Sequence, residues 1–234
     1  IPQSLSLLVT PESTCDYLPI ESSVTRFVHP DTTMDAVLYG ALMEEGFRRS
    51  GELVYQNACP HCHKCQSLKL DPALFQASRS QRRCLKRNAD LTVIPRKAEY
   101  RDEHFELYER YINSRHADGG MVNTTPASFS EFLMADWCPT WFVEMRKNGR
   151  LIAVAVVDQV PRGLSAVYTF FDPQESDRSL GTYAILWQLE LARKRRMPWV
   201  YLGYWIQGHH KMDYKSRFRP ALVYRGNRWV PLEV

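Results

Sequence analysis

Three cysteines recur at intervals of three residues in the segment NACPHCHKCQS, at Cys59, Cys62 and Cys65. Thiolates at this spacing can converge on one zinc ion or iron–sulfur cluster, because a turn between them directs the side chains to a common point. Cys15, far upstream in CDYLP, can complete a tetrahedral set of four ligands. The spacing therefore predicts a metal site on these four cysteines, with a reduced, metal-free loop as the alternative.

The six cysteines also bear on the cellular compartment. A chain of 234 residues that is 44% hydrophobic can build a core without disulfides, so a ligand cluster is a better reading than a secreted disulfide framework. No apolar run approaches the roughly 20 residues of a membrane-spanning helix. The N-terminal residues lack the basic start and apolar stretch of a secretory signal. We expect a cytoplasmic protein with no membrane partner, whose extreme N-terminus is missing.

The positive charge of the chain is concentrated in two segments. The formal net charge is only +4, but SRSQRRCLKRN carries five cations within nine residues, and ARKRR carries four more at 193–196. Clusters of this kind bind phosphates or carboxylates, or form a solvated basic face of a helix.

The pattern of apolar residues gives the elements that must position these groups. A helix is expected over about 33–45, QSLKLDP reads as a strand, and SRSQRRCLKRN as a helix capped by Ser78 or Ser80. TWFVEMR, LIAVAVVDQV and LSAVYTFF follow as strands with a hairpin turn at Asn148-Gly149. SLGTYAILWQLELARKRR is a long helix and WVYLGYW a further strand. This order predicts an α+β fold with an antiparallel meander, a helix and a strand.

Nine segments of the chain, in the same order, resemble the bacterial aspartate/glutamate leucyltransferase family, which is related to the eukaryotic arginyl-tRNA:protein transferases. These segments are CDYLP, GFRRSG, CPHCHKCQ, SRSQRR, RNADL, YTFFDP, SLGTYAIL, YLGYWI and MDYKSRFRP. The resemblance extends from about Cys15 to the C-terminus. It implies a smaller mixed N-terminal domain with the cysteines, over 1–97, and a GNAT-like acyltransferase domain over 98–234.

The resemblance implies an enzyme that moves leucine from leucyl-tRNA to the N-terminal α-amine of proteins beginning with Asp or Glu, which marks them for degradation. It implies no organic cofactor. Eukaryotic relatives carry related N-terminal cysteines that have been linked to iron–sulfur binding. This sequence departs from them, since Leu18 stands where they have a second cysteine.

We expect the binding site for the aminoacyl donor at DRSLGTY, because backbone amides at a helix N-terminus bind phosphates. We assign tRNA binding to Arg178, Ser179, Gly181 and Thr182, with Tyr201 stacking a terminal base. Core packing is an equally good reading of Tyr201. Acetyl-CoA is the weaker donor, because the acetyltransferase loop has a small residue where this chain has a large tyrosine, at position 183.

Candidate catalytic residues lie on both sides of the expected strand WVYLGYW. Asp172, before Pro173, is either a general base or a turn-forming aspartate. Tyr204 is expected beside the binding site for the aminoacyl donor. Lys211, Tyr214 and Lys215 in HHKMDYKSRFRP can position the acceptor end or donate hydrogen bonds to the oxyanion.

Selection of an acidic N-terminus requires fixed cations, and an arginine fork can hold a carboxylate through two parallel bonds. The candidates are Arg48, Arg49, Arg79, Arg82 and Arg83. Binding of tRNA phosphates is an equally good reading of the last three.

Three rival functions follow from the same residues. Arginine can replace leucine as the donated amino acid, since leucine is inferred from the bacterial branch alone. A GNAT acetyltransferase would bind acetyl-CoA. A metal-containing RNA-binding module without enzymatic activity would use the basic segments and the cysteine loop, but it leaves YTFFDP and SLGTYAIL unexplained.

Overall fold

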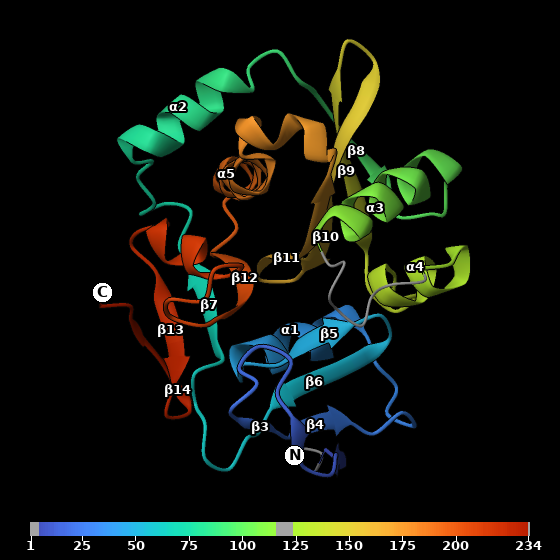
Figure 1. Ribbon diagram of the computed structural model, residues 1–234. Coiled ribbons are helices and arrows are strands. Elements are labelled where there is room, and N and C mark those ends of the chain that lie inside the picture. Colours follow the sequence, from blue (N-terminus) through green and yellow to red (C-terminus); the bar gives the residue numbers. More distant parts are fainter. Residues whose placement is uncertain (1–4, 116–123, 234) are drawn as a thin grey trace.

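The computed structural model describes residues 5–115 and 124–233, which form an α+β fold with three β-sheets (Figure 1). The largest sheet has eight strands in the order β14-β13-β7-β12-β11-β10-β9-β8. A four-stranded sheet has the order β1-β4-β6-β5, and β2 and β3 form a separate pair. The α+β prediction is confirmed.

The elements have the following bounds. The large sheet contains β7 (Gln66–Leu70), β8 (Thr92–Lys97), β9 (Thr140–Lys147), β10 (Arg150–Val160), β11 (Gly163–Phe171), β12 (Trp199–Trp205), β13 (Leu222–Arg225) and β14 (Arg228–Pro231). The small sheets contain β1 (Leu7–Val9), β2 (Ser13–Thr14), β3 (Ser22–Ser23), β4 (Thr25–Val28), β5 (Arg48–Ser50) and β6 (Leu53–Asn57). The helices are α1 (Ala36–Glu44), α2 (Arg79–Arg87), α3 (Asp102–Arg115), α4 (Pro126–Leu133) and α5 (Leu180–Lys194), with the 3-10 turns η1 (Pro173–Arg178) and η2 (Asp213–Arg217).

The predicted meander is strands β9, β10 and β11, which pair antiparallel in chain order. The hairpin between β9 and β10 turns at Asn148 and Gly149, whose φ angles are 50° and 82°. These positive φ angles match the turn that Asn-Gly favours between two strands. The chain then crosses through α5 to β12, which pairs parallel to β11.

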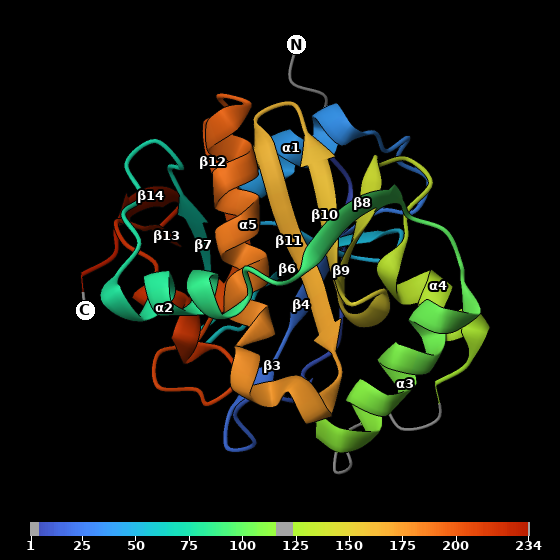
Figure 2. The ribbon, with the colours of Figure 1, turned by 90° about the horizontal axis from the view of Figure 1, so that it is seen from above.

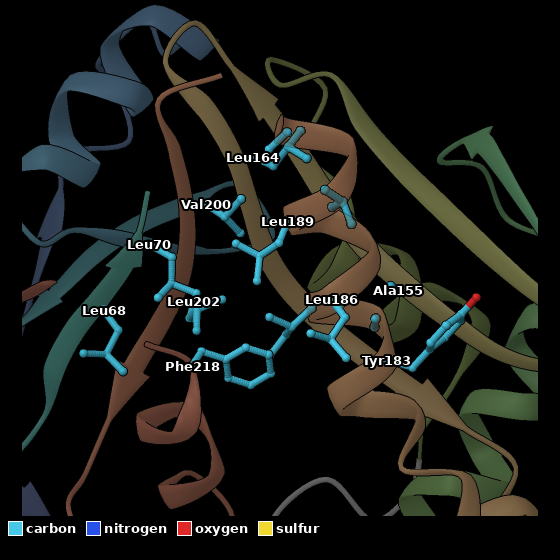
Figure 3. Close-up of a cluster of buried hydrophobic side chains, with 14 of the residues drawn as sticks. Leu68, Leu70, Ala155, Leu164, Tyr183, Leu186, Leu189, Val200, Leu202 and Phe218 are labelled. Atoms are coloured by element: carbon cyan, nitrogen blue, oxygen red, sulfur yellow. The ribbon is translucent and has the colours of Figure 1, made fainter. Parts of the chain in front are cut away.

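The two faces of β10 belong to two different hydrophobic cores. Ala153, Ala155 and Val157 pack in a cluster with α5, whereas Val154 and Val156 pack in a cluster with α3 and α4. Because successive side chains of a strand point to opposite faces, α5 covers one face of the sheet and α3 and α4 cover the other (Figure 2). Figure 3 shows the first core, in which leucines of α5 meet the apolar side chains of β7 and β12.

Helix α2 lies beside α5 in both overall views (Figures 1 and 2). It begins where the sequence predicts, because Ser78 accepts a hydrogen bond from Gln81 N and the Gln81 side chain accepts one from Ser78 N. Such a capping box satisfies backbone amides that the first turn of a helix leaves without partners. Gln81, Cys84 and Asn88 form the buried face of the helix.

Helix α1 and the four-stranded sheet form a third core with Tyr201 of β12. The short strands of this region were not predicted. Strands β7 and β8, which precede residue 98, lie in the large sheet, so segments from both predicted domains build that sheet. The division of the chain at residue 97 stays a prediction. Among the helices described, none has the length and apolar character needed to span a membrane.

Candidate active site

The candidate active site lies where β11 and β12 separate. The two strands pair only from Gly163 to Ser165 on β11 and from Trp199 to Tyr201 on β12. Both strands are irregular just beyond this point, because β11 shifts register against β10 and β12 shifts register against β7. Residues 166–169 of β11 remain partly exposed although β11 is a central strand of the sheet. The separation leaves a gap in the backbone pairing in the middle of the sheet, which we call the opening.

The Arg48 guanidinium occupies the point of separation. Nη2 of Arg48 donates a hydrogen bond to Ala166 O at 3.2 Å, and Nη1 donates to Met43 Sδ at 3.8 Å. Gly203, with φ of 75°, lies directly against it, since a Cβ at this position would be 3.1 Å from Nη2. Arg48 is only 7% exposed, yet no carboxylate in the described parts of the chain forms an ion pair with it. A buried cation thus faces the opening without a counter-charge.

Lys215 extends from η2 to the backbone of β12. Its Nζ donates a hydrogen bond to Tyr204 O at 2.7 Å, on β12. Burial of the amine and the nearby charge of Arg48 lower the pKa of Lys215 to about 7. A lysine whose pKa is lowered this far has a neutral fraction near pH 7 and can accept a proton.

Tyr204 and Tyr201 are built into the protein interior. Tyr204 Oη accepts a hydrogen bond from Asn57 N and donates one to Gly46 O, both at 3.2 Å. Tyr201 is 1% exposed and donates a hydrogen bond to the carboxylate of Glu44. Burial raises the pKa of both phenols far above the ordinary value. The predicted stacking by Tyr201 is wrong because its ring has no exposed face, and a catalytic proton from Tyr204 is not supported.

Asp172 forms a turn, which is one of the two roles predicted for it. One carboxylate oxygen accepts a hydrogen bond from Gln174 N at 3.0 Å, and the other pairs with Arg150 at 2.6 Å. These contacts begin η1 and leave little capacity for a general base.

Arg178 is also engaged by the protein. It pairs with Asp90 at 2.8 Å and with Glu175 at 2.8 Å, and it donates to the carbonyl of Arg87. Its guanidinium thereby ties the end of η1 to the segment after α2. These contacts do not favour the predicted phosphate contact.

The remaining residues of the predicted donor turn are accessible. Ser179 is exposed in a left-handed conformation with φ of 55°, Thr182 is half-buried, and a Cβ on Gly181 would meet open space. Tyr183, in the first turn of α5, packs in the core, so this large tyrosine does not crowd the turn. The N-terminus of α5 is open to a ligand.

Arg49 is part of a buried ion pair and is not available to a substrate. Nε and Nη2 contact the two oxygens of Asp158 at 2.6 and 2.7 Å, and both side chains are 0% exposed. Further donors bond to the carbonyls of Gly51 and Leu133. Its prediction as a reader of acidic termini is wrong, because every face of the guanidinium meets protein.

The arginines of α2 lie on its exposed face. Arg79, Arg82 and Arg83, together with Lys86 and Arg87, are all exposed. Within the described ranges none of these five cations forms an ion pair, and Arg82 and Arg87 donate only to backbone carbonyls. The buried face of α2 holds the start of α5, since Asn88 Nδ2 donates to Arg178 O at 2.8 Å. The cationic face therefore adjoins the open end of α5.

Two further predicted residues lie on the segment around η2. Lys211 is exposed and its backbone N donates to Nδ1 of His209. Tyr214 is half-buried and packs against the core below α5. His209 and His210 stack on each other, with ring centroids 4.7 Å apart.

The four predicted metal ligands line a single cavity of about 650 Å³ between the N-terminal strands and β13–β14. All six cysteines are free. Burial and the neighbouring Cys15, Cys59 and Cys62 raise the pKa of Cys65 to about 12, so the thiols lie close together. They are donors of the kind that zinc and iron–sulfur clusters prefer.

The arrangement of these thiols is not that of a ligand set. Across the described residues, no group of three or more His, Cys, Asp or Glu side chains is placed to hold a metal ion. We therefore derive no catalytic step through a metal. The zinc or iron–sulfur site stays a prediction, which elemental analysis of the purified protein would test.

Arg48 and Lys215 were both predicted, but in separate roles, and the structure brings them together. The sequence reasoning missed Gly203, which lets the guanidinium of Arg48 approach β12. A glycine inside a predicted strand such as WVYLGYW is a signal for a bulge or a close backbone approach.

Two family models cover most of the chain. One, described as the C terminus of arginine-tRNA-protein transferase, matches residues 103–225, and the other, described as its N terminus, matches residues 13–83. A protein from Pseudomonas putida called aspartate/glutamate leucyltransferase is 48% identical over 228 residues, 97% of either chain. Its namesake from Hahella chejuensis is 45% identical over 230 residues, 98% of either chain.

Among solved structures, L-PGS from Bacillus licheniformis matches with a TM-score of 0.45 at 10% identity, over 74% of this chain and 50% of that chain. The sequence matches span both halves of the chain and nearly the full length of the relatives. This chain belongs to the arginine-tRNA-protein transferase family, among relatives that carry the name aspartate/glutamate leucyltransferase.

Proposed function

We propose that this protein transfers leucine from leucyl-tRNA to the α-amine of proteins that begin with Asp or Glu, marking them for degradation. The relatives' name supports the donated group and the acceptor residues, and the family description supports tRNA as the carrier. The structural observation that carries the proposal is the opening between β11 and β12, with Lys215 bonded to the backbone of β12 and Arg48 to that of β11.

The reaction is attack of an amine on an ester that is already activated. The amine nitrogen bonds to the leucyl carbonyl carbon, and the bond from that carbon to the ribose oxygen breaks. The nitrogen loses one proton and the ribose oxygen gains one. The α-amine has an ordinary pKa of roughly 8, so the enzyme needs mainly to align the reactants and to move this proton. No covalent enzyme intermediate is required.

We assign the proton transfer to Lys215. Its lowered pKa gives a neutral fraction near pH 7, and its Nζ is held by Tyr204 O of β12. The protonated form can return the proton to the ribose oxygen. Lys211 and Tyr214, near it in the chain, are assigned to positioning of the acceptor end of tRNA. Asp172 and Tyr204 are not part of this assignment because their polar atoms are bonded within the protein.

The GNAT-like architecture is also a proposal. It is supported by the order of meander, helix and strand and by parallel strands that separate beside a helix N-terminus. We place the terminal phosphates of tRNA at this N-terminus, near Ser179, Gly181 and Thr182, because amides there carry partial positive charge.

The exposed cations of α2 are assigned to the phosphates of the tRNA acceptor stem. Five cations that form no ion pair with any described residue suit a polyanion, and their face of α2 adjoins the N-terminus of α5. We therefore assign Arg79, Arg82 and Arg83 to tRNA phosphates and not to the selection of acidic N-termini. An exposed guanidinium discriminates weakly between a carboxylate and solvent.

Replacing Arg79, Arg82 and Arg83 together with glutamine is expected to raise KM for leucyl-tRNA and to leave kcat nearly unchanged. Each lost contact with a duplex phosphate should reduce the slope of log affinity against log salt by about 0.9. Titrations of tRNA at several salt concentrations measure this slope. A triple glutamine variant of the exposed Arg101, Arg110 and Arg228 is the control. An unchanged slope in the α2 variant would remove this surface from the tRNA path.

The proposed function is tested by a matrix of donors and acceptors. The protein is incubated with tRNA charged with Leu, Arg or Phe and with peptides that begin with Asp, Glu, Arg or Lys, and the products are identified by mass. We expect leucine on the Asp and Glu peptides. Arginine on those peptides would reassign the donor, and absence of any product would refute the proposal.

A further inference from the structure

We propose that Arg48 is the carboxylate-binding site of the enzyme: its guanidinium binds the side chain of the N-terminal Asp or Glu, and Lys215 then faces the α-amine of that same residue. This inference rests on the proposed function. The inference goes beyond the proposed function because it assigns the selection of the acceptor to one buried arginine and links this selection to the proton transfer.

The first argument is the cost of the buried charge. Arg48 is 7% exposed, and its bonds go to a carbonyl oxygen and a thioether sulfur, neither of which carries a negative charge. A buried guanidinium without a carboxylate is unfavourable in a folded protein. Arg49, the next residue, is equally buried and has a complete ion pair with Asp158. The missing counter-charge at Arg48 is therefore specific to that position.

The second argument is that the surroundings of Arg48 offer no substitute. The positive charge of Arg48 lowers the pKa of several neighbouring groups. These are the phenols of Tyr39, Tyr55, Tyr201 and Tyr204, and the amine of Lys215. Burial raises the pKa of each phenol, so all four stay neutral.

The nearby acids are already engaged. Glu44 of α1 pairs with Lys69 and accepts a hydrogen bond from Tyr201, and Asp158 of β10 pairs with Arg49. Among the described residues no acid pairs with Arg48, so a bound anion would supply the missing counter-charge.

The third argument is the geometry of the acceptor. In an N-terminal Asp or Glu, only the α-carbon and one or two methylene groups separate the carboxylate from the α-amine. Arg48 lies directly against Gly203, and Nζ of Lys215 bonds to the carbonyl oxygen of the next residue, Tyr204. A carboxylate on Arg48 therefore brings the α-amine near Lys215.

The site should reject Asn and Gln because an amide leaves the guanidinium unpaired. We expect the wild-type protein to prefer an Asp peptide over the matched Asn peptide by on the order of 100-fold in kcat/KM. Arg48→Met should reduce kcat/KM for the Asp peptide by a similar factor and change the Asn peptide little. The preference should then collapse to within a few-fold. Arg101→Met, an exposed arginine of the pair Arg101–Glu99, is the control.

A purely structural role for Arg48 predicts equal losses on both peptides, together with a lower Tm. Arg48→Met that keeps the wild-type preference for Asp would overturn the proposal. If the variant does not fold, the wild-type protein still gives an answer. An Asp peptide without tRNA should raise the Tm more than the Asn peptide does, and equal shifts would overturn the proposal. Wild-type protein that modifies neither peptide would instead refute the proposed function.

Discussion

Replacing Arg49 with methionine is expected to reduce the free energy of unfolding by about 3–5 kcal/mol, a large part of the stability of a typical domain. The reason is the carboxylate of Asp158, which is fully buried and loses a partner at 2.6 and 2.7 Å. The hydroxyl of Thr140 would still donate to it at 2.7 Å, but no cation among the described residues would replace the guanidinium. Urea denaturation followed by circular dichroism measures this loss.

Arg48→Met is the matched comparison for this prediction. It removes a neighbouring arginine of similar burial, but one without a carboxylate partner, so the loss of unfolding free energy should be much smaller. The double variant Arg49→Met/Asp158→Leu should recover stability, because both charges leave together. Equal losses for Arg48→Met and Arg49→Met would contradict the assignment of one arginine to stability and the other to substrate.

Replacing Lys215 with methionine is expected to slow leucyl transfer by about 100- to 10,000-fold, the range over which a positioned acid or base accelerates a reaction. Single-turnover rates with preformed leucyl-tRNA and an Asp peptide measure the chemical step. Lys215→Arg keeps a donor for Tyr204 O but cannot lose its proton, so it should be nearly as slow. An arginine variant with wild-type rates would show that charge, rather than proton transfer, matters here.

The pH dependence follows from the same lysine. Burial and Arg48 lower the pKa of Lys215 from 10.5 to about 7, so its neutral form grows as the pH rises through 7. The transfer rate of the wild-type protein should therefore rise near pH 7, and the variants should keep only the rise caused by the acceptor amine near pH 8.

The free energy of unfolding should change in the same direction with pH. Between pH 7 and 10.5 the unfolded chain binds more protons at Lys215 than the folded chain does, so this residue opposes folding more strongly as the pH falls through that window. Lys215→Met should be at least as stable as the wild-type protein at pH 7. A clear loss of stability would indicate a structural role.

The regular elements of the C-terminal half could be predicted because their signals are local. The Asn148-Gly149 turn and the apolar strands of the meander depend on neighbouring residues, and so does the cap at Ser78 in the N-terminal half. The short strands β1 to β6 lack such signals. Their existence depends on pairing between segments and on packing against α1 and Tyr201 of β12.

The roles of the site residues depend on contacts that no local pattern encodes. Arg48 and Arg49 look alike in GFRRSG, but successive residues of a strand point to opposite sides, and their partners lie more than 100 positions away at Ala166 and Asp158. Lys215 stays a candidate, and its environment depends on the separation of β11 and β12, which follows from irregular strand pairing rather than from composition.

The most direct test is a structure of the protein with a stable leucyl-adenosine analogue and a peptide that begins with Asp. The leucyl carbonyl should lie between β11 and β12, with the peptide carboxylate on Arg48 and its α-amine beside Nζ of Lys215. A complex in which the analogue binds elsewhere, for instance in the cavity lined by the cysteines, with Arg48 and Lys215 unchanged, would contradict this account.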